Sequence, residues 1–174
     1  MTDTTLPAHL HLGFLTVFAE QTGYLGGYLV TNSWGRPLEF RLSTAVQPNK
    51  VQQILYAGTL TEYLCADLIG KTLIEKTSIP AHLIITDSAN VLPLRSRIEV
   101  PVIAALSGST DAVTFNHSRS TLPLALDPKW AGDEPRVRAI LDRVDAALDL
   151  AEPFARIREA VAEARKMGVT GRAA

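Results

Sequence analysis

The sequence has little of what ties a chain to a membrane or to an oxidising compartment. Its 174 residues include one cysteine, Cys65, so no disulfide can form within the chain. It lacks an unbroken apolar run of about 18 residues, the length of a membrane span. Its amino terminus has no basic region followed by an apolar stretch, as a secretory signal would. These absences predict a cytoplasmic protein without membrane contact, long enough to form one domain with its own core.

Charge is scarce in the first two-thirds of the chain. Residues 1–118 carry 7 Lys or Arg and 9 Asp or Glu, whereas residues 119–174 carry 10 and 9. The net charge of −1 gives no electrostatic support for a nucleic-acid partner, although such a partner is compatible with the alternative below. A compact domain normally has charge on all sides of its surface. The charge-poor part is therefore expected to be covered, either by the charged tail or by another molecule.

Three segments near the amino terminus predict an antiparallel meander. Apolar, aromatic and β-branched residues dominate the first two, and two consecutive glycines in the second indicate a bulge or a close backbone approach. In the third, Leu38, Phe40 and Leu42 alternate with polar residues, which is typical of a strand with one wet face. The predicted strands cover residues 9–20, 24–32 and 36–46.

Two helices are predicted after the meander, over residues 49–57 and 60–76. Asn49 followed by Gln52 fits a capping box, and a second such pattern follows Gly58, so we expect a break between the helices. Apolar residues of the second helix occupy more than one stripe. That pattern predicts a helix buried on more than one side.

The remaining segments predict a mixed sheet and a helical tail. Strands are expected over 82–87, 97–106 and 112–116, with Pro101 indicating an edge or bulged position. Turn-forming residues throughout 117–134 predict an ordered surface loop.

The tail is expected to form two helices that meet at Glu152-Pro153, since proline suits a first helical turn and disrupts a helix interior. The fold class is thus α+β, with further strands extending the meander into a mixed sheet. We expect a core domain over 1–134, and a tail over 135–174 that packs on it as a helical hairpin or kinked pair.

The order of these elements, with four short segments, resembles the ribonuclease H-like superfamily. The segments are TVFAE ending at Glu20, then GYLGGY, NKVQQ, and IITDS containing Asp87. The resemblance implies catalytic carboxylates at Glu20, Asp87 and Asp133. Glu20 and Asp87 would hold Mg²⁺, which would activate a water for attack on a phosphodiester. Their carboxylates should then lie within about 6 Å of each other.

The same residues also have simpler interpretations. Gln52, which is neutral, occupies a helix position where the family has a carboxylate. Asp87 begins Asp-Ser-Ala-Asn, which is ordinary turn chemistry, and Glu20 can simply end an apolar strand at the surface. The nuclease hypothesis, or a degenerate relative that still binds nucleic acid, is therefore kept as the alternative.

The preferred hypothesis is a non-catalytic intracellular subunit or adaptor that needs no cofactor. It would act through a charge-poor interface, because segments 10–30 and 51–74 contain only four charged residues. The partner would be another protein or a second copy of the chain. Aromatic residues dominate interface energetics, so the candidate contact residues are Tyr24, Tyr28, Trp34, Tyr56 and Tyr63.

Overall fold

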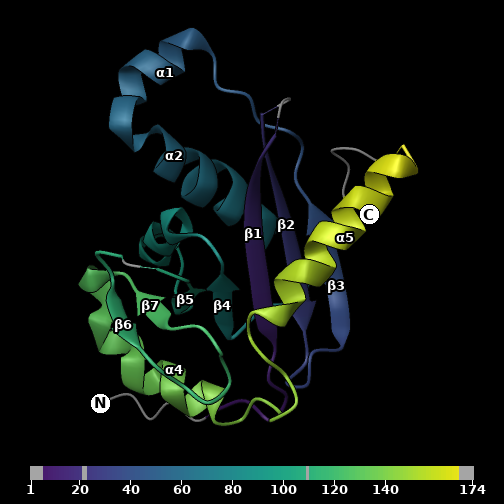
Figure 1. Ribbon diagram of the computed structural model, residues 1–174, viewed down its shortest axis with the longest axis vertical. Coiled ribbons are helices and arrows are strands. Elements are labelled where there is room, and N and C mark those ends of the chain that lie inside the picture. The colour runs from purple at the N-terminus through teal and green to yellow at the C-terminus, as the bar shows by residue number, and fades with distance from the viewer. Residues whose placement is uncertain (1–5, 21–22, 109, 169–174) are drawn as a thin grey trace.

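A seven-stranded sheet forms the centre of the computed structural model, which describes residues 6–20, 23–108 and 110–168. The strand order is β3-β2-β1-β4-β5-β7-β6, so β3 and β6 form the two edges (Figure 1). The strands are β1 (Leu12–Glu20), β2 (Gly23–Thr31), β3 (Pro37–Leu42), β4 (Leu83–Thr86), β5 (Val102–Ala105), β6 (Val113–Phe115) and β7 (Leu124–Leu126).

The sheet is mixed, which confirms the α+β class. β1, β2 and β3 form the predicted antiparallel meander, while β4 pairs with β1 and β5 with β4 in parallel. β7 returns antiparallel to β5, and β6 pairs with β7.

Two expectations about the later strands are wrong. β5 is an interior strand, and Pro101 lies just before it, where its carbonyl accepts a hydrogen bond from the Ile84 amide at 3.0 Å. Pro101 therefore interrupts no pairing inside the strand. β7 lies in the segment predicted to be a loop, because three apolar residues between turns are too few for a recognisable period.

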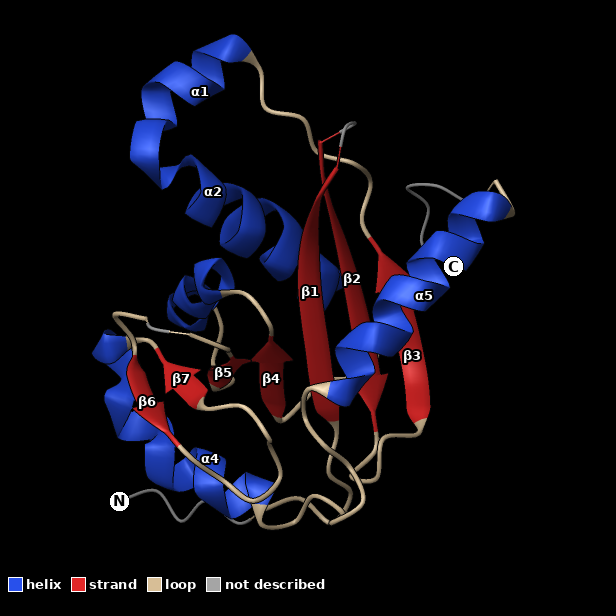
Figure 2. Ribbon diagram, viewed as in Figure 1, coloured by secondary structure: helices blue, strands red, loops and turns tan. Residues whose placement is uncertain are grey.

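The helices after the meander lie at the predicted positions, but their helical type differs from the prediction. Asn49 and Gln52 form the expected capping box at the start of α1, and the helical segment from 60 to 76 is continuous with a π-helical middle, η2. The helices are α1 (Lys50–Tyr56), η1 (Ala57–Thr59), α2 (Leu60–Glu62), η2 (Tyr63–Lys71), α3 (Thr72–Lys76), η3 (Ala89–Arg97), η4 (Pro128–Asp133), α4 (Glu134–Leu141) and α5 (Glu152–Lys166) (Figure 2).

The tail contains two helices, but they do not meet at Pro153. α4 ends at Leu141, and residues 142–151 form turns before α5 begins at Glu152. Pro153 lies in the first turn of α5, as expected for a residue without an amide hydrogen. The tail is thus a separated pair of helices and not a hairpin with a single kink.

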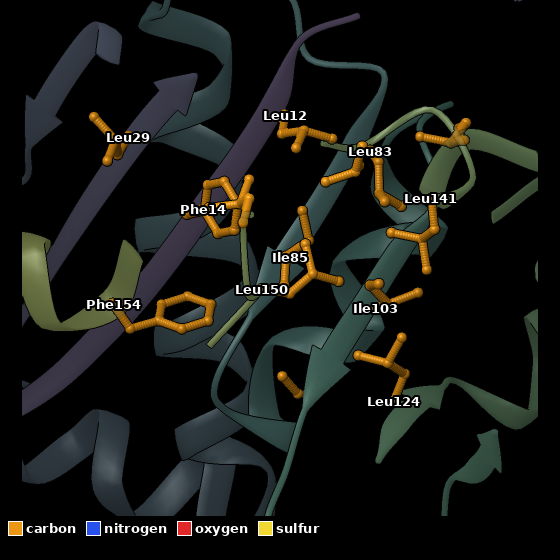
Figure 3. Close-up of a cluster of buried hydrophobic side chains, with 14 of the residues drawn as sticks. Leu12, Phe14, Leu29, Leu83, Ile85, Ile103, Leu124, Leu141, Leu150 and Phe154 are labelled. Atoms are coloured by element: carbon orange, nitrogen blue, oxygen red, sulfur yellow. The ribbon is translucent and has the colours of Figure 1, made fainter. Parts of the chain in front are cut away.

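Helices cover both faces of the sheet. On one face, Phe154 and Ile157 of α5 pack with strand residues such as Phe14 and Ile85 (Figure 3). The rings of Phe14 and Phe154 meet edge to face, with centroids 5.8 Å apart. On the other face, η2 and η3 pack on Leu15 and Ile84. The central strands are consequently apolar on both sides.

One helical segment lies away from this core. α1 contains no buried residue, and Figure 1 shows it at the end of the molecule's long axis, away from the sheet. It is joined to α2 through Ala57, whose φ of 46° and ψ of −122° place an L-residue in a region that normally requires glycine. Holding an alanine there costs of the order of 1–3 kcal/mol.

Candidate functional site

The structure does not bring the three predicted catalytic carboxylates together. Asp87 follows β4 and forms an ion pair with Arg158 of α5, whereas Glu20 at the end of β1 pairs with Arg165. Asp133 pairs with Arg95 of η3. Across residues 6–20, 23–108 and 110–168, no group of three or more His, Cys, Asp or Glu side chains could hold a metal ion.

The register of β1 and β4 explains why Glu20 and Asp87 do not meet. Their last paired residues are Leu15 and Thr86, so the residue of β1 beside Asp87 is Thr16. Glu20 lies four residues further along the strand, so its Cα lies about 13 Å from that of Thr16 at 3.3 Å per residue. The register therefore places a threonine, and not Glu20, beside Asp87.

Thr16 is the residue of β1 that lies beside Asp87 in the register of the two strands. It is fully buried, and its hydroxyl has no hydrogen-bond partner. Asp87 lines a pocket of about 320 Å³ together with Ser107, Phe154 and Arg158. One carboxylate neutralised by a guanidinium, beside a neutral hydroxyl, does not fit Mg²⁺, which prefers several oxygen ligands including carboxylates.

The unpartnered hydroxyl of Thr16 gives a stability prediction. Replacing Thr16 with valine keeps the side-chain shape and removes a buried polar group, so the free energy of unfolding should rise by about 1 kcal/mol. Thr86, equally buried, is the matched control, because its hydroxyl accepts a hydrogen bond from the Ser88 amide at 3.2 Å. Thr86→Val should therefore lower the free energy of unfolding by about 1 kcal/mol. Urea denaturation measures both, and a loss of stability in Thr16→Val would contradict the assignment.

Asp133 takes part in a largely buried ion pair with Arg95. Its carboxylate lies 2.8 Å from Nε of Arg95, whose side chain is 9% exposed. Arg95 also donates to the carbonyl of Ile98 at 2.8 Å and lies 3.7 Å from the ring centre of Trp130. These contacts join η3 to η4, so Asp133 holds two short helices together.

Cys65 is a core residue. It is 3% exposed in η2, and burial raises the pKa of its thiol to about 11. A thiol in that state is neither a nucleophile nor a ready metal ligand near neutral pH.

The five aromatic residues predicted at an interface lie in different environments. Tyr28 is 1% exposed inside the core, so in this structure it is a core residue and offers no surface. Tyr24 is half-buried at the start of β2, and Trp34 is 57% exposed in the turn after that strand. Tyr56 and Tyr63 are half-buried and stack on each other, with ring centres 4.2 Å apart.

The charge-poor segment 10–30 is largely covered by the chain itself. It consists mainly of β1 and β2, which are interior strands with helices on both faces, and its lack of charge reflects this double burial. The expectation of an interface there is corrected accordingly. Within 51–74, residues from Leu64 to Leu73 supply the side chains that face the sheet. Only the part before Tyr63 remains largely uncovered.

That uncovered part contains an exposed apolar face on α1. Val51, Ile54 and Leu55 of α1 are 63%, 65% and 75% exposed. They follow the i, i+3, i+4 spacing that places side chains on one helical face. We call these three residues the α1 stripe. The signal in the sequence was an amphipathic segment without charge, but such a pattern equally describes a helix packed on its own core.

None of the described helices is both long and apolar enough to span a bilayer.

No protein-family model and no curated protein matches this chain. Solved structures with the same fold are found at low sequence identity. Endonuclease V from Streptomyces avermitilis superimposes with a TM-score of 0.56 and 9% identity, over 94% of this chain and 85% of that one. A protein of unknown function from Archaeoglobus fulgidus gives a TM-score of 0.54 and 11% identity, over 90% and 98%. The chain therefore has a nuclease-like fold, which agrees with the predicted resemblance at the level of the fold but does not support the individual motifs.

Proposed function

We propose that this chain is a non-catalytic interaction domain that uses a nuclease-like fold as a scaffold and binds a protein partner through the α1 stripe. The exposure of that stripe is the observation that carries the proposal. The chain buries Leu64, Ile69 and Leu73 in the helices that follow, yet leaves three large aliphatic side chains of α1 in solvent. Apolar patches exposed on a protein surface are often the surfaces through which it binds another molecule.

The surroundings of Asp87 support the non-catalytic half of the proposal. Arg158 places a fixed positive charge on the one carboxylate that would lie at the metal position. A divalent cation would have to displace that guanidinium, against charge repulsion. Thr16 beside it supplies no negative charge to compensate. Arg158 and Arg165 each connect α5 to the end of a strand through a partly exposed ion pair.

The alternative function is metal-dependent nucleic-acid cleavage or nucleic-acid binding. It is favoured by the fold shared with endonuclease V and by the position of Asp87 directly after β4. Under this alternative Mg²⁺ would be the cofactor and Asp87 its ligand.

One comparison of variants tests the main proposal. The wild-type chain, Ile54→Glu and Gln53→Glu are each immobilised and exposed to extract from the source cells, and retained proteins are quantified. Gln53 neighbours Ile54, is also exposed, and points away from the α1 stripe, so it controls for the added charge. We expect retained proteins, the chain itself included, to be lost with Ile54→Glu and kept with Gln53→Glu. Equal retention by all three forms would reject the α1 stripe as the binding surface.

A cleavage assay separates this proposal from the alternative. The wild-type chain and Asp87→Asn are incubated with DNA, RNA and hybrid duplexes in Mg²⁺ or Mn²⁺. We expect no cleavage by either form. Metal-dependent cleavage by the wild type that disappears in Asp87→Asn would establish the nuclease alternative.

A further inference from the structure

The α1 stripe has a single charged neighbour on its own helix, Lys50 at the first position. Residues 51–61 contain no Asp, Glu, Lys or Arg, and Lys50 is the only charged residue of α1. Interfaces between different proteins commonly use charges at the rim to select the partner and to exclude others. The α1 stripe has no charge within it and only Lys50 at one end, so it offers no pattern of several charges that would select a different protein.

A second copy of the same helix offers a matching apolar surface, because a two-fold axis places the same residues of both copies opposite each other. In an antiparallel pair across a two-fold axis, each apolar side chain meets apolar side chains of the other copy. The two Lys50 side chains then lie at opposite ends of the pair, about 10 Å apart for a helix of this length, and do not repel each other strongly. Stripes of i, i+3, i+4 residues pack in this way at interaxial distances of about 8–10 Å.

α1 is also held in place before any partner arrives. Its first turn is fixed by the reciprocal hydrogen bonds of Asn49 and Gln52, at 2.8 and 3.0 Å. Its far end is fixed by the stacking of Tyr56 on Tyr63 and by the strained backbone of Ala57. A preformed helix loses less conformational entropy on binding than a flexible segment does. Ala57 lies at the junction of α1 with the helices that follow, and the three residues of the α1 stripe are exposed.

We propose that α1 pairs with α1 of a second copy of this chain, antiparallel across a two-fold axis, so that Val51, Ile54 and Leu55 are buried between them. The proposal rests on the proposed function, in that it names the partner of the same surface. The α1 stripe offers only a few hundred Å², less than the roughly 800 Å² per partner of a standard interface. The dimer is therefore reversible, with a dissociation constant of the order of micromolar or weaker.

Sedimentation velocity over a concentration series, from micromolar to hundreds of micromolar, tests the pairing. The wild-type chain should shift reversibly from monomer to dimer across the series. Ile54→Glu should remain monomeric throughout, because two carboxylates would be buried next to each other at the two-fold axis. Gln53→Glu should dimerise as the wild type does. Circular dichroism and thermal unfolding check that both variants fold, which is expected since both positions are exposed.

Cysteine cross-linking tests the arrangement itself. Ile54→Cys should form a disulfide-linked dimer on mild oxidation, whereas Gln53→Cys should not, because it faces away from the axis. The native Cys65 does not interfere, since it is buried.

Two outcomes would overturn the pairing. One is a wild-type chain that stays monomeric at every concentration. The other is a dimer whose formation is unaffected by Ile54→Glu and that is not cross-linked through Ile54→Cys. If the chain is monomeric while a different protein is retained in a manner that depends on Ile54, the self-pairing fails and the proposed function stands. If nothing is retained in that manner and no dimer forms, both fail.

Discussion

A chain that ends at Glu134 is expected to lose its fold. Residues 135–174 supply nine side chains to the core on one face of the sheet, and each contributes about 1.5–3 kcal/mol by its burial. Their combined loss is as large as or larger than the 5–15 kcal/mol by which a typical domain is stable. The nine are Val137, Ile140, Leu141, Val144, Leu148, Leu150, Phe154, Ile157 and Val161.

Solubility on expression and near-ultraviolet circular dichroism measure this effect. The truncated chain should be insoluble or lack fixed aromatic packing, because Phe14 and Ile85 lose the helices that cover them. A chain that ends at Gly168 keeps α4 and α5 and is the matched control. A folded, soluble 1–134 fragment would show instead that the tail is a separate arm.

Replacing Asp133 is expected to destabilise the protein by about 3–5 kcal/mol. In Asp133→Ala the guanidinium of Arg95 stays buried without its carboxylate, which is the costly way to break a buried ion pair. Glu134→Ala is the control, because its i, i+4 pair with Arg138 is much more exposed, at 35% and 42% of the two side chains, and contributes about 0.3–0.5 kcal/mol. Urea denaturation measures both losses.

The double replacement Arg95→Met with Asp133→Leu distinguishes the stability lost through an unpaired charge from the stability lost through poorer packing. It should recover most of the stability lost in Asp133→Ala, since neither partner is left as an unpaired buried charge. If Asp133→Ala were as stable as the wild type, the ion pair would be unimportant and a functional role for Asp133 would gain support.

Local patterns in the sequence were sufficient to predict most of the fold. The alternation around Leu38 and Phe40, the capping box at Asn49 and the proline at 153 each act over a few residues, and each predicted element exists. The failures involve contacts distant in sequence. β7 is a strand because it pairs with β5 and β6, and η3 forms between two predicted strands, in a segment for which no helix was predicted.

The candidate site could be predicted less well than the fold. Glu20 and Asp87 were placed at the ends of their strands correctly, but whether two strand ends meet depends on register, which a single sequence does not reveal. The ion pairs with Arg158 and Arg165 join positions many residues apart. A segment without charged residues can also be either buried or exposed in the fold, and the sequence alone does not distinguish the two. In β1 and β2 the lack of charge comes from burial on both faces, and in α1 it accompanies exposure.

The edges of the sheet determine how the protein behaves when it is concentrated. An exposed edge strand can recruit strands from other molecules and seed fibrils. At one edge, β3 begins with Pro37, which has no amide hydrogen to donate, and Glu39 and Arg41 place charges along the strand. The other edge, β6, is only three residues long. Both features oppose edge-to-edge growth, so the sheet itself is expected to resist fibril formation when the protein is concentrated.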